Sequence, residues 1–199
     1  MGWVESSLVK WIRTYTHFDV MQSPRPFPEA VQIPDGLPDD RPIWIVDISH
    51  QRIWRNCDQK GWLSAPVSTS CWGTGNTSGS HQTPLGLHEI SEVIGDGAEP
   101  GQPFASRIPS GPPLPPAQWQ EGDGDKILSR ILWLKGLEEQ NTDSYSRYIY
   151  LHGTNQEHLL GTPASQGCVR MANRTIIAWA DTLSTPLPYV WIGHAAQRD

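Results

Sequence analysis

Glycine and proline recur along the whole chain, and this recurrence restricts the fold more than any other feature of the sequence. The 199 residues include eighteen of each. Proline interrupts a helix, and glycine costs conformational entropy inside one. Frequent turns and long loops follow from such a composition. It therefore favours a mainly β fold over a helical bundle.

Short segments with alternating apolar side chains support this expectation from residue 43 onward. Alternation with a period of two is the pattern of a strand that buries one face. The segment YIYLH at 148–152 is one example, and it ends on a histidine. The expected strands cover residues 43–48, 52–55, 61–68, 85–94, 127–134, 148–152 and 187–192.

One helix is expected near the end of the main domain. Asn173 suits the N-cap position, because an Asn side chain can accept hydrogen bonds from the amides of the first turn. Apolar residues then recur at helical spacing as far as about Leu183. The predicted buried face consists of Ile176, Ile177, Trp179 and Ala180.

The chain divides into three parts by composition. Residues 1–42 combine a predicted N-terminal helix with a linker in which six prolines fall between 22 and 42. Residues 43–193 form the main domain, and 194–199 form a short tail. Within the domain, residues 95–126 are rich in Pro and Gly without periodicity. A loop of that length is expected either to cover a functional site or to be disordered.

Charge and hydropathy limit the partners and the compartment. A formal net charge of -6 argues against nucleic-acid binding, which requires a basic surface. No segment approaches the roughly 18 apolar residues that a transmembrane helix needs. Charged residues interrupt the apolar pattern within 1–20, unlike a secretory signal. We therefore expect a cytoplasmic protein, or a periplasmic one if an upstream signal has been removed.

The three cysteines, Cys57, Cys71 and Cys168, do not form a disulfide framework, because their number is odd. A Cys57–Cys71 bridge remains open as an alternative to free thiols. No CxxC pair is present, and the histidines outside 152 lack metal-ligand spacing. We expect no metal and no cofactor.

Cys168 and His152 are the residues that suggest chemistry. Gly167 precedes the cysteine and permits a tight turn, in which the amides of both residues can point at one anion. A thiol that attacks a carbonyl needs such amides for the oxyanion and an imidazole to take its proton. The structural alternative is a buried thiol and an unrelated histidine at the end of a strand, which for a single Cys and His is the more common case.

The amino-acid sequence around these two residues favours the catalytic alternative. HGT at 152–154, followed by SQGCVRM at 165–171, resembles the signature of the L,D-transpeptidase catalytic domain, the YkuD family. The upstream segment SHQTPLG at 80–86 is similar to a second family element that precedes a strand. The resemblance covers residues 43–193. It implies a curled mixed β-sheet with a helix after the nucleophile.

The resemblance also implies roles for individual residues. Cys168 corresponds to the nucleophile and His152 to its base, with the imidazole oriented by a backbone carbonyl, expected at Gly153. The amides of Gly167 and Cys168 would form the oxyanion hole. One position departs from the family pattern, because Gln166 replaces a histidine. The residues expected to contact substrate are Arg170, Thr154, Ser165, Arg130 and Arg107.

Family substrates are peptidoglycan stem peptides, which end in a D-amino acid and carry several carboxylates. The expected product depends on what resolves the thioester. Water would make the protein an L,D-carboxypeptidase that trims muropeptides, the outcome we favour because of the expected compartment. A second stem peptide would make it an L,D-transpeptidase that forms 3→3 cross-links. A catalytically inactive domain that binds peptidoglycan fragments is the non-enzymatic alternative.

Overall fold

The computed structural model describes residues 36–57, 61–120 and 124–194. The predicted N-terminal helix, most of the linker and the tail beyond residue 194 lie outside these residues. In the described chain no helix is both long and apolar enough to cross a membrane. Cys71 carries a free thiol, so the suggested Cys57–Cys71 bridge is wrong.

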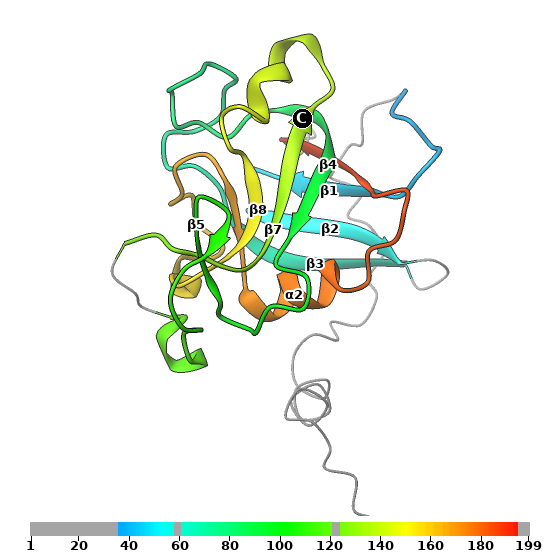
Figure 1. Cartoon of the computed structure of the whole chain (residues 1–199). Helices are drawn as coiled ribbons and strands as arrows, with labels where there is room; N and C mark the ends of the chain where they lie inside the picture. The colour runs from blue at the N-terminus through cyan, green and yellow to red at the C-terminus, as the bar shows by residue number, and fades with distance from the viewer. Residues whose placement is uncertain (1–35, 58–60, 121–123, 195–199) are drawn as a thin grey trace, which may run out of the picture.

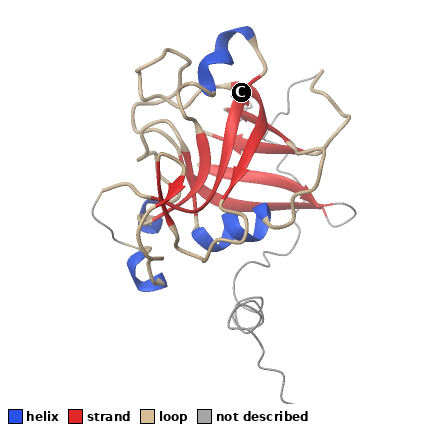
Figure 2. Cartoon of the chain, in the orientation of Figure 1, coloured by secondary structure: helices blue, strands red, loops and turns tan. Residues whose placement is uncertain are grey.

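A single curled sheet forms the body of the domain (Figures 1 and 2). Its order is β4-β10-β1-β2-β3-β9-β8-β7-β5-β6. β4 pairs with β10 on one side and with β7 on the other, so the sheet closes on itself. The pairs β1/β10 and β8/β9 are parallel and the other ladders are antiparallel, which confirms the predicted mixed β fold. The strands are β1 (Ile43–Asp47), β2 (Arg52–Cys57), β3 (Gly61–Ser68), β4 (Gly86–Ile94), β5 (Pro103–Ala105), β6 (Ile108–Pro109), β7 (Ile127–Gly136), β8 (Tyr150–Thr154), β9 (Val169–Met171) and β10 (Tyr189–Gly193).

The expected helix after the cysteine is α2 (Asn173–Ala180), which packs against the sheet at the bottom of Figure 1. Trp179 meets Trp44 edge to face, with ring centroids 5.2 Å apart. Three predicted details are wrong. The N-cap is Ala172, because the Asn173 side chain instead bonds the Thr154 carbonyl at 2.6 Å. The helix ends at Ala180, and Ile177, which was expected on the buried face, is only partly buried. Among the described residues there are also three short 3-10 helices, η1 (Pro116–Gln118), η2 (Glu139–Ser144) and η3 (Glu157–Leu159).

Successive side chains of a strand point to opposite faces of the sheet, so β8 and β9 contribute to two different hydrophobic clusters. Leu151, Val169 and Met171 point inward, into the main core beneath α2. Their neighbours Tyr150 and Cys168 point outward and belong to a second cluster with Phe104, Ile131 and Trp133. The outward face of β8 and β9 therefore carries the residues predicted to do the chemistry.

His152 was expected at the end of a strand, but it lies inside β8. Tyr148 has a left-handed backbone, with φ of 59°, so it cannot belong to the strand. β8 instead continues through Gly153 and Thr154, which pair with Leu128 and Ile127 of β7. His152 is consequently buried, with 2% of its surface exposed.

The described part of the 95–126 segment is ordered into a hairpin and η1. β5 and β6 are joined by a two-residue turn in which Ser106 and Arg107 both have positive φ. That is the backbone of a type I′ turn, whose twist matches paired strands. β5 also pairs with the first part of β7, so the hairpin extends the sheet on the side of β7 opposite β8.

Candidate active site

Cys168 and His152 share the outward face of two neighbouring parallel strands. The register pairs Leu151 with Val169 and His152 with Arg170. Cys168 precedes Val169 by one residue, so its side chain leaves the sheet on the same side as His152. The thiol donates to the Tyr148 carbonyl at 3.4 Å, and within the described chain no hydrogen bond joins it to the imidazole. Such slack is usual for a catalytic pair without substrate.

The His152 ring is oriented by its own neighbour. Its Nδ1 lies 2.8 Å from the Gly153 carbonyl, which is the contact that the resemblance implied. This bond places the proton on Nδ1 and leaves Nε2 as the acceptor. Gly153 can only be glycine, because a Cβ there would lie 2.7 Å from the Leu128 carbonyl and closer still to the Asn173 side chain. The lack of space for a side chain at Gly153 keeps the backbone in the position from which its carbonyl meets His152 Nδ1.

Burial keeps both groups uncharged. Desolvation lowers the pKa of His152 below its ordinary value, although the charge of Asp125 opposes this shift. Desolvation also raises the pKa of the Cys168 thiol to about 12, and the backbone amide of Tyr150 opposes it. Both groups are therefore neutral near pH 7, the thiol protonated and the imidazole unprotonated.

This resting state predicts a pH dependence. The basic form of His152 is present above its lowered pKa, so reactivity that needs this base should rise through an ionisation below about pH 6.5. Direct alkylation of Cys168 by iodoacetamide should keep increasing with pH toward 12, since the thiolate fraction does. Peptide mapping by mass spectrometry would follow alkylation of Cys168 separately from that of Cys57 and Cys71. A rate that levels off near pH 7 would show a preformed thiolate and contradict the neutral pair.

The segment before Cys168 has the expected tight turn. Gly167 has φ of 121°, a conformation that glycine adopts readily and other residues avoid. Its amide donates to Ser165 Oγ at 3.3 Å, which is long for such a bond. Ser165 is buried, and its hydroxyl donates to the Cys168 carbonyl at 2.6 Å. Ser165 therefore shapes the loop, in place of the expected substrate contact.

The upstream SHQTPLG segment packs beside this turn. Thr83 donates to the Gly167 carbonyl at 3.0 Å and accepts from the Ser70 amide at the same distance. Arg147 bonds the Gln82 carbonyl at 2.7 Å. The two sequence elements that carry the family resemblance thus meet in space.

Arg170 occupies a structural position rather than the predicted substrate position. It is completely buried, and its guanidinium bonds Gln156 at 2.8 Å and Ser68 at 2.9 Å. Its ion pair with Asp125 measures 3.3 Å. Thr154, also buried, donates to the same carboxylate at 3.4 Å. Neither residue has a surface on which a substrate carboxylate can bind, because burial and these partners occupy them.

The other two arginines expected to contact substrate differ from each other in burial: Arg130 is buried and Arg107 is partly exposed. Arg130 is buried and bonds Asp181 at 3.0 Å and the Ala98 carbonyl at 2.9 Å, so its expected substrate contact is replaced by a tertiary one. Arg107 is half-buried at the tip of the β5–β6 hairpin. Its guanidinium lies 4.6 Å from the Trp133 ring centre and 4.9 Å from that of Tyr148. It also donates to the Tyr150 hydroxyl at 3.3 Å.

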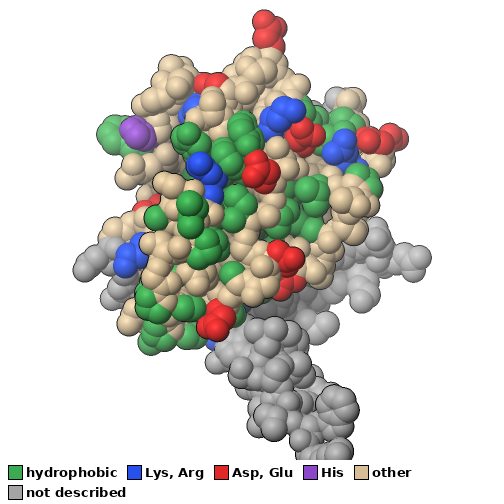
Figure 3. All heavy atoms as spheres, viewed as in Figure 1, with side chains coloured by type: hydrophobic (Ala, Val, Ile, Leu, Met, Phe, Trp, Pro, Cys, Tyr) green, Lys and Arg blue, Asp and Glu red, His purple; other side chains and the backbone are tan. Residues whose placement is uncertain are grey.

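Sequence reasoning missed the aromatic group around Arg107 and the acidic Asp125. Trp133 stacks on Tyr145 with ring centres 4.0 Å apart and meets Tyr150 edge to face. The alternating aromatics of YIYLH were the available signal for the first group. No sequence pattern pointed to Asp125, because it follows an irregular segment. Its ion pair with Arg170 of β9 joins residues that are far apart in the sequence. Figure 3 shows hydrophobic and charged side chains mixed on the face that carries β5, β7 and β8.

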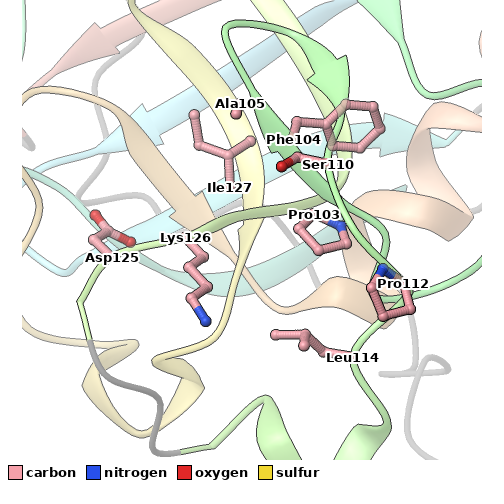
Figure 4. A pocket seen from close by; sticks show the side chains of 9 residues that line it. All are labelled: Pro103, Phe104, Ala105, Ser110, Pro112, Leu114, Asp125, Lys126 and Ile127. Atoms are coloured by element: carbon pink, nitrogen blue, oxygen red, sulfur yellow. The ribbon is translucent and has the colours of Figure 1, made fainter.

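A pocket of about 470 Å³ adjoins this face (Figure 4). Asp125 and Lys126 lie on one side of it, across from Pro112. Phe104 connects the pocket to the cluster that includes Cys168. Asp125 connects it to Arg170, which is paired with His152 in the sheet. The remaining lining residues are Pro103, Ala105, Ser110, Leu114 and Ile127.

Comparison with known families gives one extensive match. The model of the L,D-transpeptidase catalytic domain, YkuD, matches residues 41–188. No curated protein matches the sequence. Among solved structures, similar ones include an L,D-transpeptidase from Xylanimonas cellulosilytica (15% identity, 81% of this chain and 65% of that one, TM-score 0.49). Another is an L,D-transpeptidase from Mycobacterium smegmatis (15% identity over 77% of this chain and 58% of that one, TM-score 0.48). The LD transpeptidase LdtMt1 in complex with imipenem is a third (16%, 77% and 59%, TM-score 0.44). The chain spans less than two thirds of the length of each.

Proposed function

Because the chain belongs to the L,D-transpeptidase catalytic domain (YkuD) family, we propose that it cleaves peptidoglycan stem peptides through a thioester on Cys168. The observation that carries this proposal is the placement of Cys168 and His152 on one outward face of adjacent parallel strands. A neutral His152 with its Nδ1 held by Gly153 is suited to accept a proton at Nε2.

The proposed reaction has two steps. His152 takes the thiol proton as the Cys168 sulfur attacks the carbonyl before the terminal D-Ala, and the amides of Gly167 and Cys168 stabilise the oxyanion. The C–N bond then breaks, and His152 returns the proton to the leaving amine. In the second step a water molecule loses a proton to His152 and attacks the thioester carbonyl. The C–S bond breaks, the carboxylate product leaves, and the thiol is restored.

We favour water as the acyl acceptor, which makes the protein an L,D-carboxypeptidase of muropeptide tetrapeptides. The β5–β6 hairpin pairs with β7, the strand next to β8. The pocket that the hairpin lines has a volume of about 470 Å³, which suits the end of one stem peptide, although neither Cys168 nor His152 lines it. The free thiols of Cys71 and Cys168 fit a reducing cytoplasm, where recycled fragments are trimmed.

A single incubation tests the function. The protein is mixed with disaccharide-tetrapeptide, and the products are separated by mass. Release of D-Ala with disaccharide-tripeptide supports the carboxypeptidase. A 3→3 cross-linked dimer identifies the transpeptidase instead, and the proposed acceptor is then wrong. If neither forms and imipenem leaves Cys168 unmodified, the domain is a binding module.

Arg107 and Arg130 provide a matched pair of predictions. Arg107→Met should raise KM for a stem peptide about tenfold with little change in stability, since we propose that this half-buried guanidinium binds a substrate carboxylate. Arg130→Met should leave KM unchanged but lower the unfolding free energy by about 2 kcal/mol, because it removes a buried guanidinium and its partners. Steady-state kinetics and denaturant unfolding of both variants measure these effects. The reverse assignment of effects would contradict the proposal for Arg107.

A further inference from the structure

Large hydrophobic side chains are exposed around the candidate active site. Tyr148, 51% exposed, supplies the carbonyl that accepts the Cys168 thiol. Ile108, 67% exposed, follows Arg107 in the hairpin. Trp72, 63% exposed, lies in the loop that packs beside the Gly167 turn. An indole with most of its surface exposed, on a loop bound to the segment that carries the thiol, is available to stack against a ligand.

The backbone that presents Trp72 is held firmly. Ser70 to Gly73 form a turn closed by the Gly73 amide on the Ser70 carbonyl at 3.2 Å. The Trp72 amide donates to Ser70 Oγ at 3.0 Å, and the Trp72 carbonyl accepts from the Gln82 side chain at 3.1 Å. The indole therefore faces solvent from a fixed support, which lowers the entropy cost of stacking against a ligand.

The same loop is attached to the segment that carries the thiol. The Cys71 amide donates to the Ser165 carbonyl at 3.1 Å, and Thr83 bonds Gly167 at the other end of the loop. Trp72 is one residue from the first contact, and Cys168 is three residues beyond Ser165. At about 3.5 Å per residue, the indole support lies within roughly 20 Å of the thiol.

We propose that Trp72 stacks against the N-acetylated disaccharide of a muropeptide. This inference rests on the proposed function, in which the cleaved bond lies three residues from the sugar. Three extended residues span roughly 10 Å, which carries the sugar out of the catalytic site toward the loop that holds Trp72. An indole offers a flat apolar face for the C–H side of a sugar ring, and Gln166 and His81, both exposed, offer polar contacts for its edges.

The test compares two substrates that differ only in the sugar. Wild-type protein should release D-Ala from disaccharide-tetrapeptide with a kcat/KM about tenfold above that for the free tetrapeptide. Trp72→Ala should reduce this ratio to near one by slowing only the sugar-bearing substrate. Trp72→Phe should keep most of the preference, because it retains an aromatic face. Leu137→Ala, at an exposed residue outside the loop, is the matched control and should leave the ratio unchanged.

A binding measurement separates this inference from the proposed function. Saturation-transfer NMR with the free disaccharide should detect contact in wild-type protein and lose it in Trp72→Ala. Sugar binding without D-Ala release from either substrate would overturn the proposed function and leave the Trp72 site standing. An unchanged substrate ratio in Trp72→Ala, or an equal loss on both substrates, would overturn the site, since the latter indicates a role in loop structure only.

Discussion

Cys168→Ala should lower release of D-Ala from a stem peptide by at least about 10³-fold, because alanine supplies no nucleophile. The fold should persist, since the side chain is small and only half-buried in its cluster. Mass spectrometry should also show no imipenem adduct on this variant.

The matched control for this variant is Cys71→Ala. Cys71 also carries a free thiol and contacts the nucleophile segment through its backbone amide. Its side chain is exposed, so activity should stay close to that of the wild type. If Cys168→Ala released D-Ala at the wild-type rate, the assignment of the nucleophile and of the reaction would both be wrong.

His152→Gln should lower kcat/KM by about 10³-fold, because glutamine can hydrogen-bond but cannot take the thiol proton. The remaining activity should lose the ionisation below pH 6.5 that the wild type shows. Stability should fall modestly, since the bond to the Gly153 carbonyl can be partly replaced.

His88→Gln is the control for a buried histidine. His88 is fully buried between the Gly86 carbonyl and Ser144, and burial lowers its pKa to about 4. Its replacement should reduce stability but leave kcat/KM and the pH profile intact. Equal kinetic losses in both variants would indicate that His152 acts through the fold and not as the base.

Much of the sheet could be predicted because alternation is a local property. The Gly61–Ser68 strand has the predicted limits, and most other strands differ by one to three residues. The β9 strand was missed because Val169–Met171 is too short to show a period. The hairpin at Pro103–Pro109 was missed because its turn uses Ser106 and Arg107, which carry no turn signal in the sequence.

The residues of the candidate site also fall into those that local sequence predicts and those that depend on long-range contacts. By itself the sequence determined the family, the Cys168 and His152 pair and the Gly167 turn, because these depend on residue type and close spacing. Only the tertiary structure decided which arginines are accessible. Arg170 and Arg130 are buried beside carboxylates that approach from distant parts of the chain, whereas Arg107 remains half-exposed over aromatic rings. Burial and ion pairing depend on contacts between segments far apart in sequence, and no local pattern encodes them.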